Sequence, residues 1–107
     1  MTTSGRRDQW ILVGADDSSL TFRLREGAIK TVGRAPRADF IVNRALVSRL
    51  HCRLTAGADR LDVEDLSSTN GTFVNGKRIK RAELKSGDRL KVGRVEFTVT
   101  RPDRPGN

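Results

Sequence analysis

Thr72-Phe73-Val74-Asn75-Gly76-Lys77-Arg78-Ile79 is the stretch that decides the fold class of this chain. The pair Asn75-Gly76 separates two short runs, and it favours a tight two-residue turn because both central positions need a positive φ. Residues 72–79 are therefore predicted to form a hairpin of two adjacent antiparallel strands.

Outward from this hairpin, apolar residues recur at every second position. The alternation covers residues 22–25, 52–55, 61–64 and 95–100. Such a pattern is typical of antiparallel sheet with one buried and one exposed face. No long window has the 3.6-residue spacing of a helix. Short strands joined by turns, without crossover helices, predict an all-β sandwich or barrel.

The length of 107 residues indicates one domain. We expect the domain to span residues 8–101, between flexible tails at residues 1–7 and 102–107. The first tail lacks the apolar run of a signal peptide, and no stretch approaches a membrane-spanning length. The single cysteine, Cys52, has no partner for an internal disulfide. A cytoplasmic protein with no membrane partner is the expectation.

The net charge of +8 indicates an anionic partner. A nucleic-acid-binding module is one alternative, and it would bind any polyanion with a steep salt dependence. The chain has four Phe, one Trp and no Tyr, so side chains that could stack on bases are scarce. No nucleic-acid-binding fingerprint is present, which makes this alternative the weaker one.

An enzyme is not expected from this sequence. No nucleophile is paired with a base, and no Gly-rich loop has the length of a nucleotide-binding loop. His51 and Cys52 have no second pair to complete a zinc site, so neither a metal nor a cofactor is predicted. Cys52 is interpreted as a small core residue, and the scattered aspartates as turn and loop formers: Asp39, Asp65 and Asp88.

Three polar clusters lie between the hydrophobic runs: Gly33-Arg34, Ser48-Arg49-Leu50-His51 and Ser67-Ser68-Thr69-Asn70-Gly71-Thr72. Each falls at the end or start of an expected strand, where loops of a sandwich can converge on one site. Guanidinium, hydroxyl and amide donors suit a phosphate, which offers only acceptor oxygens. The clusters therefore predict an anion-binding site.

In this order and spacing, followed by Val74-Asn75-Gly76, the clusters resemble the signature of the forkhead-associated (FHA) domain, over roughly residues 10–100. The resemblance implies a two-sheet antiparallel β-sandwich of about eleven strands, with the binding loops at one end. It also implies a module that recognises phosphothreonine in a partner protein or peptide, within Ser/Thr kinase signalling. The partner would be a Ser/Thr kinase or its substrate.

The resemblance also assigns roles to single residues. Arg34 would donate to the phosphate, Ser48 and the side chain or backbone of Arg49 would contact it, and Thr69 would complete the cradle. Asn70 would hydrogen-bond the peptide main chain beside the phosphothreonine. Structural support of this site is expected from four further residues: Gly33, His51, Ser68 and Gly71.

Two questions stay open at this point. Leu46, at a position that in some relatives helps to read the third residue after the phosphothreonine, would favour an apolar partner, whereas Arg44 would attract an acidic one. Thr2 and Thr3 lie in the expected tail, and phosphorylation there would allow binding within the same molecule.

Overall fold

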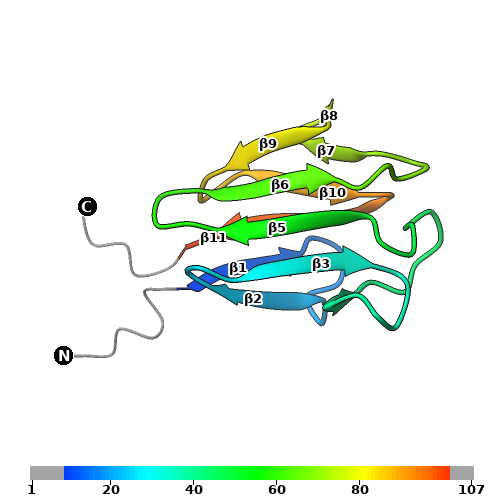
Figure 1. The fold of residues 1–107 in the computed structure, drawn as a ribbon, viewed down its shortest axis with the longest axis horizontal. Helices are drawn as coiled ribbons and strands as arrows, with labels where there is room; N and C mark the ends of the chain where they lie inside the picture. The colour runs from blue at the N-terminus through cyan, green and yellow to red at the C-terminus, as the bar shows by residue number, and fades with distance from the viewer. Residues whose placement is uncertain (1–8, 102–107) are drawn as a thin grey trace.

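The computed structural model describes residues 9–101 (Figure 1). Our expectations for the tails at 1–7 and 102–107, for a domain start at residue 8, and for Thr2 and Thr3 lie outside the described residues. In residues 9–101 there is no helix with the length and apolarity needed to cross a membrane.

Residues 9–101 form eleven strands in two sheets (Figure 1). The first sheet has the order β2-β1-β11-β10-β7-β8, built from β1 (Gln9–Gly14), β2 (Thr21–Arg25), β7 (Thr72–Val74), β8 (Lys77–Ile79), β10 (Arg89–Val92) and β11 (Val95–Thr100). The second has the order β4-β3-β5-β6-β9, built from β3 (Ile29–Gly33), β4 (Phe40–Ile41), β5 (Cys52–Ala56), β6 (Leu61–Asp65) and β9 (Arg81–Leu84).

The predicted antiparallel sandwich is confirmed, with one exception. The short edge strand β4 runs parallel to β3, pairing Val32 with Phe40. The hairpin predicted for residues 72–79 is present: β7 and β8 pair in antiparallel register. Its turn residues have positive φ values, 50° at Asn75 and 86° at Gly76, as the Asn-Gly pair requires.

The core lies between the sheets and consists of the apolar residues that alternate along the strands. Trp10 and Leu12 from β1 and Phe97 and Val99 from β11 are almost completely buried. Cys52 at the start of β5 is fully buried among them, as predicted.

An aromatic pair joins the two sheets along the side formed by their edge strands. Phe22 of β2 stacks on Phe40 of β4, with ring centroids 4.6 Å apart. Phe97 of β11 lies 5.8 Å from Phe22, so the pair is continuous with the core. This contact holds the edge strand β4 in place, and the chain passes from β4 into the polar loop before β5.

The pairing pattern places the connections that carry the polar clusters at one end of the sandwich. Strands β1, β3, β6 and β10 all end there, at the right of Figure 1, and β5, β7 and β11 begin there. Antiparallel neighbours alternate in direction, so the loops that follow the first set and precede the second lie at the same edge. All three polar clusters lie in these loops or at the strand ends that border them.

Candidate functional site

A pocket of about 420 Å³ opens at this end of the sandwich. Its wall comes from three connections: the segment after β3, the loop before β5 and the loop before β7. The lining residues are Arg34, Ala45, Leu46, Val47, Ser48, Thr69 and Asn70. The fold thus brings together Arg34, Ser48, Thr69 and Asn70, which the sequence assigned to one binding site.

Arg34 is tethered to the neighbouring loop through its inner nitrogen. Its Nε donates to the carbonyl oxygen of Val47 at 3.0 Å, and its backbone N–H donates to the carbonyl oxygen of Ser48 at 2.9 Å. The two terminal nitrogens of the guanidinium make no hydrogen bond within residues 9–101, and the side chain lines the pocket. A planar cation held in this way can offer two parallel donors to an oxyanion.

Ser48 connects the loop before β5 to the loop before β7. Its Oγ accepts a hydrogen bond from the backbone N–H of Thr69 at 3.1 Å. The hydroxyl proton of Ser48 therefore remains available for an acceptor in the pocket. Thr69 itself is exposed on the pocket wall.

Asn70 is oriented by a backbone carbonyl across the pocket. Its Nδ2 donates to the carbonyl oxygen of Leu46 at 3.0 Å, and Leu46 adopts a positive φ of 74°. Gly93, in the β10–β11 turn, packs against the same carbonyl, since an added Cβ would lie 2.6 Å from that oxygen. The turn thus braces the peptide group that holds the Asn70 amide.

Arg49 is the one predicted binding residue that does not line the pocket. Its side chain is exposed, while its carbonyl oxygen accepts a hydrogen bond from the N–H of Ala35 at 3.1 Å. A Cβ added at Gly33 would overlap this carbonyl oxygen, so only glycine allows the end of β3 to approach the loop this closely.

His51 is fully buried beneath the two loops. Its Nδ1 accepts a hydrogen bond from the backbone N–H of Ser48 at 3.0 Å, and its Nε2 lies 2.7 Å from the carbonyl oxygen of Gly71. Only the neutral ring with its proton on Nε2 satisfies both groups. His51 therefore fixes the distance between the Ser48 loop and the Gly71 loop.

Asp65, at the end of β6, organises the loop that leads to β7. Its carboxylate accepts hydrogen bonds from the hydroxyls of Ser68 at 2.5 Å and Thr72 at 2.6 Å, and from the Ser68 N–H at 3.1 Å. The Ser68 hydroxyl in turn accepts from the N–H of Gly71 at 3.0 Å. Burial works to raise the pKa of Asp65, but the hydrogen bonds from Ser68 and Thr72 outweigh it and lower that pKa.

Our sequence interpretation underestimated Asp65 by calling it a turn former only. It is the shared acceptor for the residues that shape one wall of the pocket. The available signal was its position three residues before Ser68, a spacing at which a carboxylate can accept bonds from a turn. Asp88 does hold a turn, since it accepts from the N–H of Lys85 at 2.8 Å.

The arrangement supplies hydrogen-bond donors and a cation rather than reactive groups. Within residues 9–101, no three side chains of the metal-binding types lie close enough to hold a metal ion. A tethered guanidinium, a hydroxyl proton and an amide around one pocket suit an oxyanion attached to a polar chain.

Comparison with known proteins identifies the family. The model of the FHA domain matches residues 30–93. FHA domain-containing protein FhaA of Mycobacterium tuberculosis is 36% identical over 78% of this chain and 16% of its own length. Glycogen accumulation regulator GarA of the same species is 34% identical over 78% of this chain and 51% of its own length. The chain thus spans about half or less of these curated relatives.

Solved structures agree with this assignment. A structure described as an analysis of phosphothreonine-dependent FHA domain interactions superimposes with a TM-score of 0.79 and 34% identity. The match covers 86% of this chain and 95% of that one. The resemblance drawn from the three polar clusters is thereby confirmed. The chain belongs to the FHA domain family.

Proposed function

We propose that this FHA domain binds a phosphothreonine-containing segment of a partner protein in the pocket at the end of the sandwich. Arg34 donates to the phosphate, Ser48 and Thr69 supply hydroxyl donors, and Asn70 binds the peptide main chain. Arg49 closes the site from outside the pocket wall by turning its exposed side chain toward the bound phosphate.

The observation that best supports the proposal is the state of Arg34. Its Nε donates to the Val47 carbonyl, neither terminal nitrogen has a hydrogen-bond partner within residues 9–101, and the side chain lines the pocket. A phosphothreonine has nearly two negative charges at neutral pH and three acceptor oxygens, which match these donors. The family's phosphothreonine-dependent relative gives the ligand its chemical class.

The free energies of the expected hydrogen bonds predict an affinity near the micromolar range. Three or four charge-assisted hydrogen bonds of about 1.5–3 kcal/mol each supply on the order of 5–10 kcal/mol before association costs are subtracted. A dissociation constant near 1 μM corresponds to about −8 kcal/mol. The proposal therefore predicts reversible, regulated binding of short phosphopeptides.

Fluorescence anisotropy with matched peptides tests the proposal. Peptides bearing phosphothreonine, phosphoserine or unmodified threonine are titrated with the native domain, with Arg34→Ala and with Arg23→Ala. Arg23 is an exposed arginine of β2 whose side chain has no hydrogen bond or ion pair within residues 9–101, so its variant is a matched control for lost charge. Arg34→Ala is expected to weaken phosphothreonine binding about 30-fold or more.

A DNA duplex titrated in the same experiment distinguishes phosphopeptide binding from the alternative, a nucleic-acid-binding module. Selective binding of the phosphothreonine peptide that only Arg34→Ala abolishes supports the proposal. Equal loss in both arginine variants, or comparable binding of duplex and phosphopeptide with a steep salt slope, would leave only the net charge of +8 as the cause.

The proposed role is recognition without catalysis, in a cytoplasmic Ser/Thr kinase pathway. A phosphorylated partner, either a kinase or its substrate, supplies the phosphothreonine. The free, buried Cys52 fits a reducing compartment.

A further inference from the structure

The outer surface of three neighbouring strands in the first sheet carries basic side chains without acidic partners. Outward-facing residues alternate there with residues that face the core. On β10, β7 and β8 they are Arg89, Lys91, Phe73 and Arg78, and we call this set the basic face. The side chains of its three cations make no ion pair and no hydrogen bond within residues 9–101.

Two carboxylates lie near the basic face, and neither neutralises it. Glu96 of β11 is the cross-strand neighbour of Lys91, but no ion pair joins the two side chains. The Lys91 ammonium instead lies 5.3 Å from the centroid of the Phe73 ring. Asp88 accepts a hydrogen bond from the backbone N–H of Lys85 at 2.8 Å, so it is engaged in its own turn. The basic face therefore retains a local excess of positive charge.

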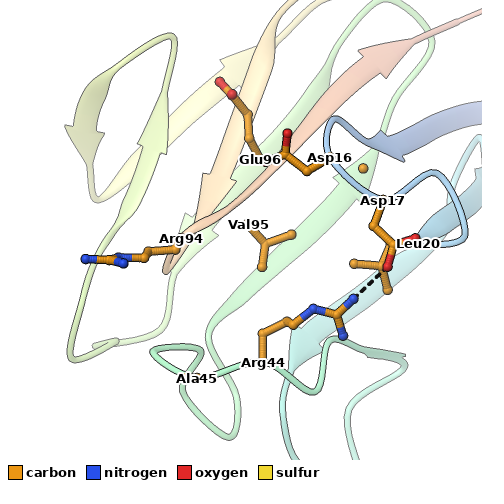
Figure 2. Close-up of a pocket in the computed structure, with 9 residues that line it drawn as sticks. Asp16, Asp17, Leu20, Arg44, Ala45, Arg94, Val95 and Glu96 are labelled. Atoms are coloured by element: carbon orange, nitrogen blue, oxygen red, sulfur yellow. Dashed lines mark hydrogen bonds and ion pairs between the residues drawn. The ribbon is translucent and has the colours of Figure 1, made fainter.

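Several arginines elsewhere in the molecule are compensated by carboxylates. On the outer face of the second sheet, Arg53 lies 2.6 Å from Glu64. Figure 2 shows another pair, in which Nη2 of Arg44 lies 2.7 Å from Oδ2 of Asp17. Uncompensated cations that lie close together, as on the basic face, leave a positive potential that favours a negatively charged ligand.

The basic face adjoins the candidate site through Arg78. A Cβ added at Gly71 would lie 2.8 Å from the Nε of Arg78, so this guanidinium lies over the loop that carries Thr69 and Asn70. Outward side chains repeat about every 7 Å along a strand, and neighbouring strands are about 4.8 Å apart. The three cations therefore extend to roughly 15 Å from the loop. One bound partner can contact the pocket and the basic face together.

The chemistry of the basic face favours an acidic protein segment over nucleic acid or a membrane. Its one aromatic side chain, Phe73, is half-buried with the Lys91 ammonium over its ring, which leaves little ring surface for a base to stack on. The exposed large apolar side chains of the described chain are Ile29, Ile41 and Leu46, and none lies on these strands. Insertion into a membrane interface would need such groups here, whereas carboxylates need only cations that can donate.

We propose that the basic face docks an acidic segment of the protein whose phosphothreonine occupies the pocket. This inference rests on the proposed function and adds a second contact site to it. Two linked contacts raise the affinity because the second one forms at a high effective concentration. A flexible linker of about ten residues has a root-mean-square length of about 17 Å, which matches the span from the loop. The selected partner therefore carries Asp- or Glu-rich sequence within about ten residues of its phosphothreonine.

Two-part peptides test this inference by fluorescence anisotropy. Each peptide joins a phosphothreonine segment, through a Gly/Ser linker of about ten residues, to a block of glutamates or to an equally long block of glutamines. The block stands before the phosphothreonine in one series and after it in the other. In one of the two orders, the Glu block is expected to tighten binding about tenfold over the Gln block at low ionic strength, and added salt should reduce this gain.

Arg89→Gln combined with Lys91→Gln removes two charges from the basic face, and it is expected to reduce the gain from the Glu block to about twofold or less. Lys80→Gln combined with Arg81→Gln is the matched control. Both control residues are exposed, neither makes an ion pair in the described part of the chain, and Arg81 lies on the outer face of the second sheet. The control removes the same charge and should keep the gain.

Binding of the Gln-block peptide reports on the phosphate pocket alone, and it should be equal in the two double variants. Loss of its dependence on phosphothreonine would contradict the proposed function itself. With that dependence intact, the inference is overturned if the Glu block gives no gain in either order, or if both double variants lose the gain equally. Thermal unfolding verifies that each variant remains folded.

A DNA duplex and phosphatidylserine vesicles test the two other anionic partners. The native domain and both double variants are expected to bind each of them equally weakly. Binding of either one that the Arg89→Gln and Lys91→Gln variant loses, while the Lys80→Gln and Arg81→Gln control keeps it, would assign the basic face to that partner and overturn the inference.

Discussion

Backbone carbonyl groups orient several of the side chains that form or support the candidate site. Arg34 is tethered by the Val47 carbonyl and Asn70 by the Leu46 carbonyl, while His51 faces the carbonyl of Gly71. Each of these bonds crosses from one loop to another. A residue-level change is therefore expected to act through loop geometry as well as through the group it removes.

The first prediction concerns Asp65. Asp65→Asn removes a charged acceptor shared by Ser68 and Thr72, and it is expected to destabilise the domain by about 1–3 kcal/mol at neutral pH. Asp62→Asn, in the same strand but in an exposed ion pair at 3.8 Å, is the control and is expected to cost less than about 1 kcal/mol. Urea unfolding measures both values.

The difference in stability between the native domain and Asp65→Asn is expected to depend on pH. Because the folded-state pKa of Asp65 is lowered from 3.8, its contribution is present above that value and is lost as the pH falls through the lower, folded pKa. The stability difference between the native domain and Asp65→Asn should therefore shrink below about pH 4. A difference that grows on acidification would contradict the assigned role of Asp65.

At the residue scale, the sequence could group Arg34, Ser48, Thr69 and Asn70 because they lie in loops that border strands, and the structure places all four on one pocket. Their roles in binding stay a prediction. The Arg44–Asp17 pair could not be predicted in this way. Its members are 27 positions apart, and their contact depends on how the β1–β2 loop packs on the loop before β5. Exposed charges give no periodic pattern from which such a pairing could be derived.

Among the structural elements, the short β10–β11 turn helps to position the loop before β5. Gly93 has a φ of 63° and approaches the Leu46 carbonyl, so this turn supports the loop that lines the candidate site. The hairpin of β7 and β8 could be predicted from Asn75-Gly76 alone. The parallel pairing of β4 with β3 could not, because a two-residue strand has no alternation to recognise.

The second prediction compares two glycine variants. Gly93→Ala and Gly87→Ala both place a side chain at positive φ, which costs about 1–2 kcal/mol. Only at Gly93 would the new Cβ meet a backbone carbonyl, since nothing lies within 4 Å of the one at Gly87.

Gly93→Ala should consequently lose more stability, and it alone should weaken phosphopeptide binding by displacing the Leu46 carbonyl from Asn70. Anisotropy and urea unfolding of the two variants provide the comparison. Equal effects on binding would show that the turn does not brace the pocket.

Across the whole molecule, the candidate site and a cluster around Arg101 lie at opposite ends of the sandwich. Far from the loops, the buried Arg101 stacks on Trp10, with its guanidinium carbon 5.0 Å from the ring centroid. It also donates to the carbonyl oxygen of Gly57 at 3.0 Å and to Glu26 at 3.1 Å. This cluster fixes the last residue of the described chain to the turn between β5 and β6.

The third prediction separates stability from recognition at this scale. Arg101→Ala removes the stacking contact and both hydrogen bonds, and it is expected to cost about 2–4 kcal/mol. Phosphopeptide affinity should remain unchanged at temperatures where the variant is folded. Weakened binding in the folded variant would show that the two ends are coupled.

The overall charge pattern was the least informative part of the sequence. A net charge of +8 is compatible with nucleic acid and with phosphopeptides alike. The fold distinguishes the two because it gathers Arg34, Ser48, Thr69 and Asn70 around one pocket, whereas the basic run at residues 77–81 extends along edge strands. The composition alone does not show which basic residues are gathered at the pocket and which lie along the edge strands.

A phosphopeptide titration followed by two-dimensional NMR of the ¹⁵N-labelled domain tests the central claim most directly. The account predicts that the phosphothreonine peptide shifts the amide signals of residues 33–35, 45–49 and 68–71, while the signals around Arg101 stay in place. The unmodified peptide should leave all of them unchanged. Shifts that instead concentrate on the basic strand β8, or that appear equally with the unmodified peptide, would contradict a phosphothreonine site in these loops.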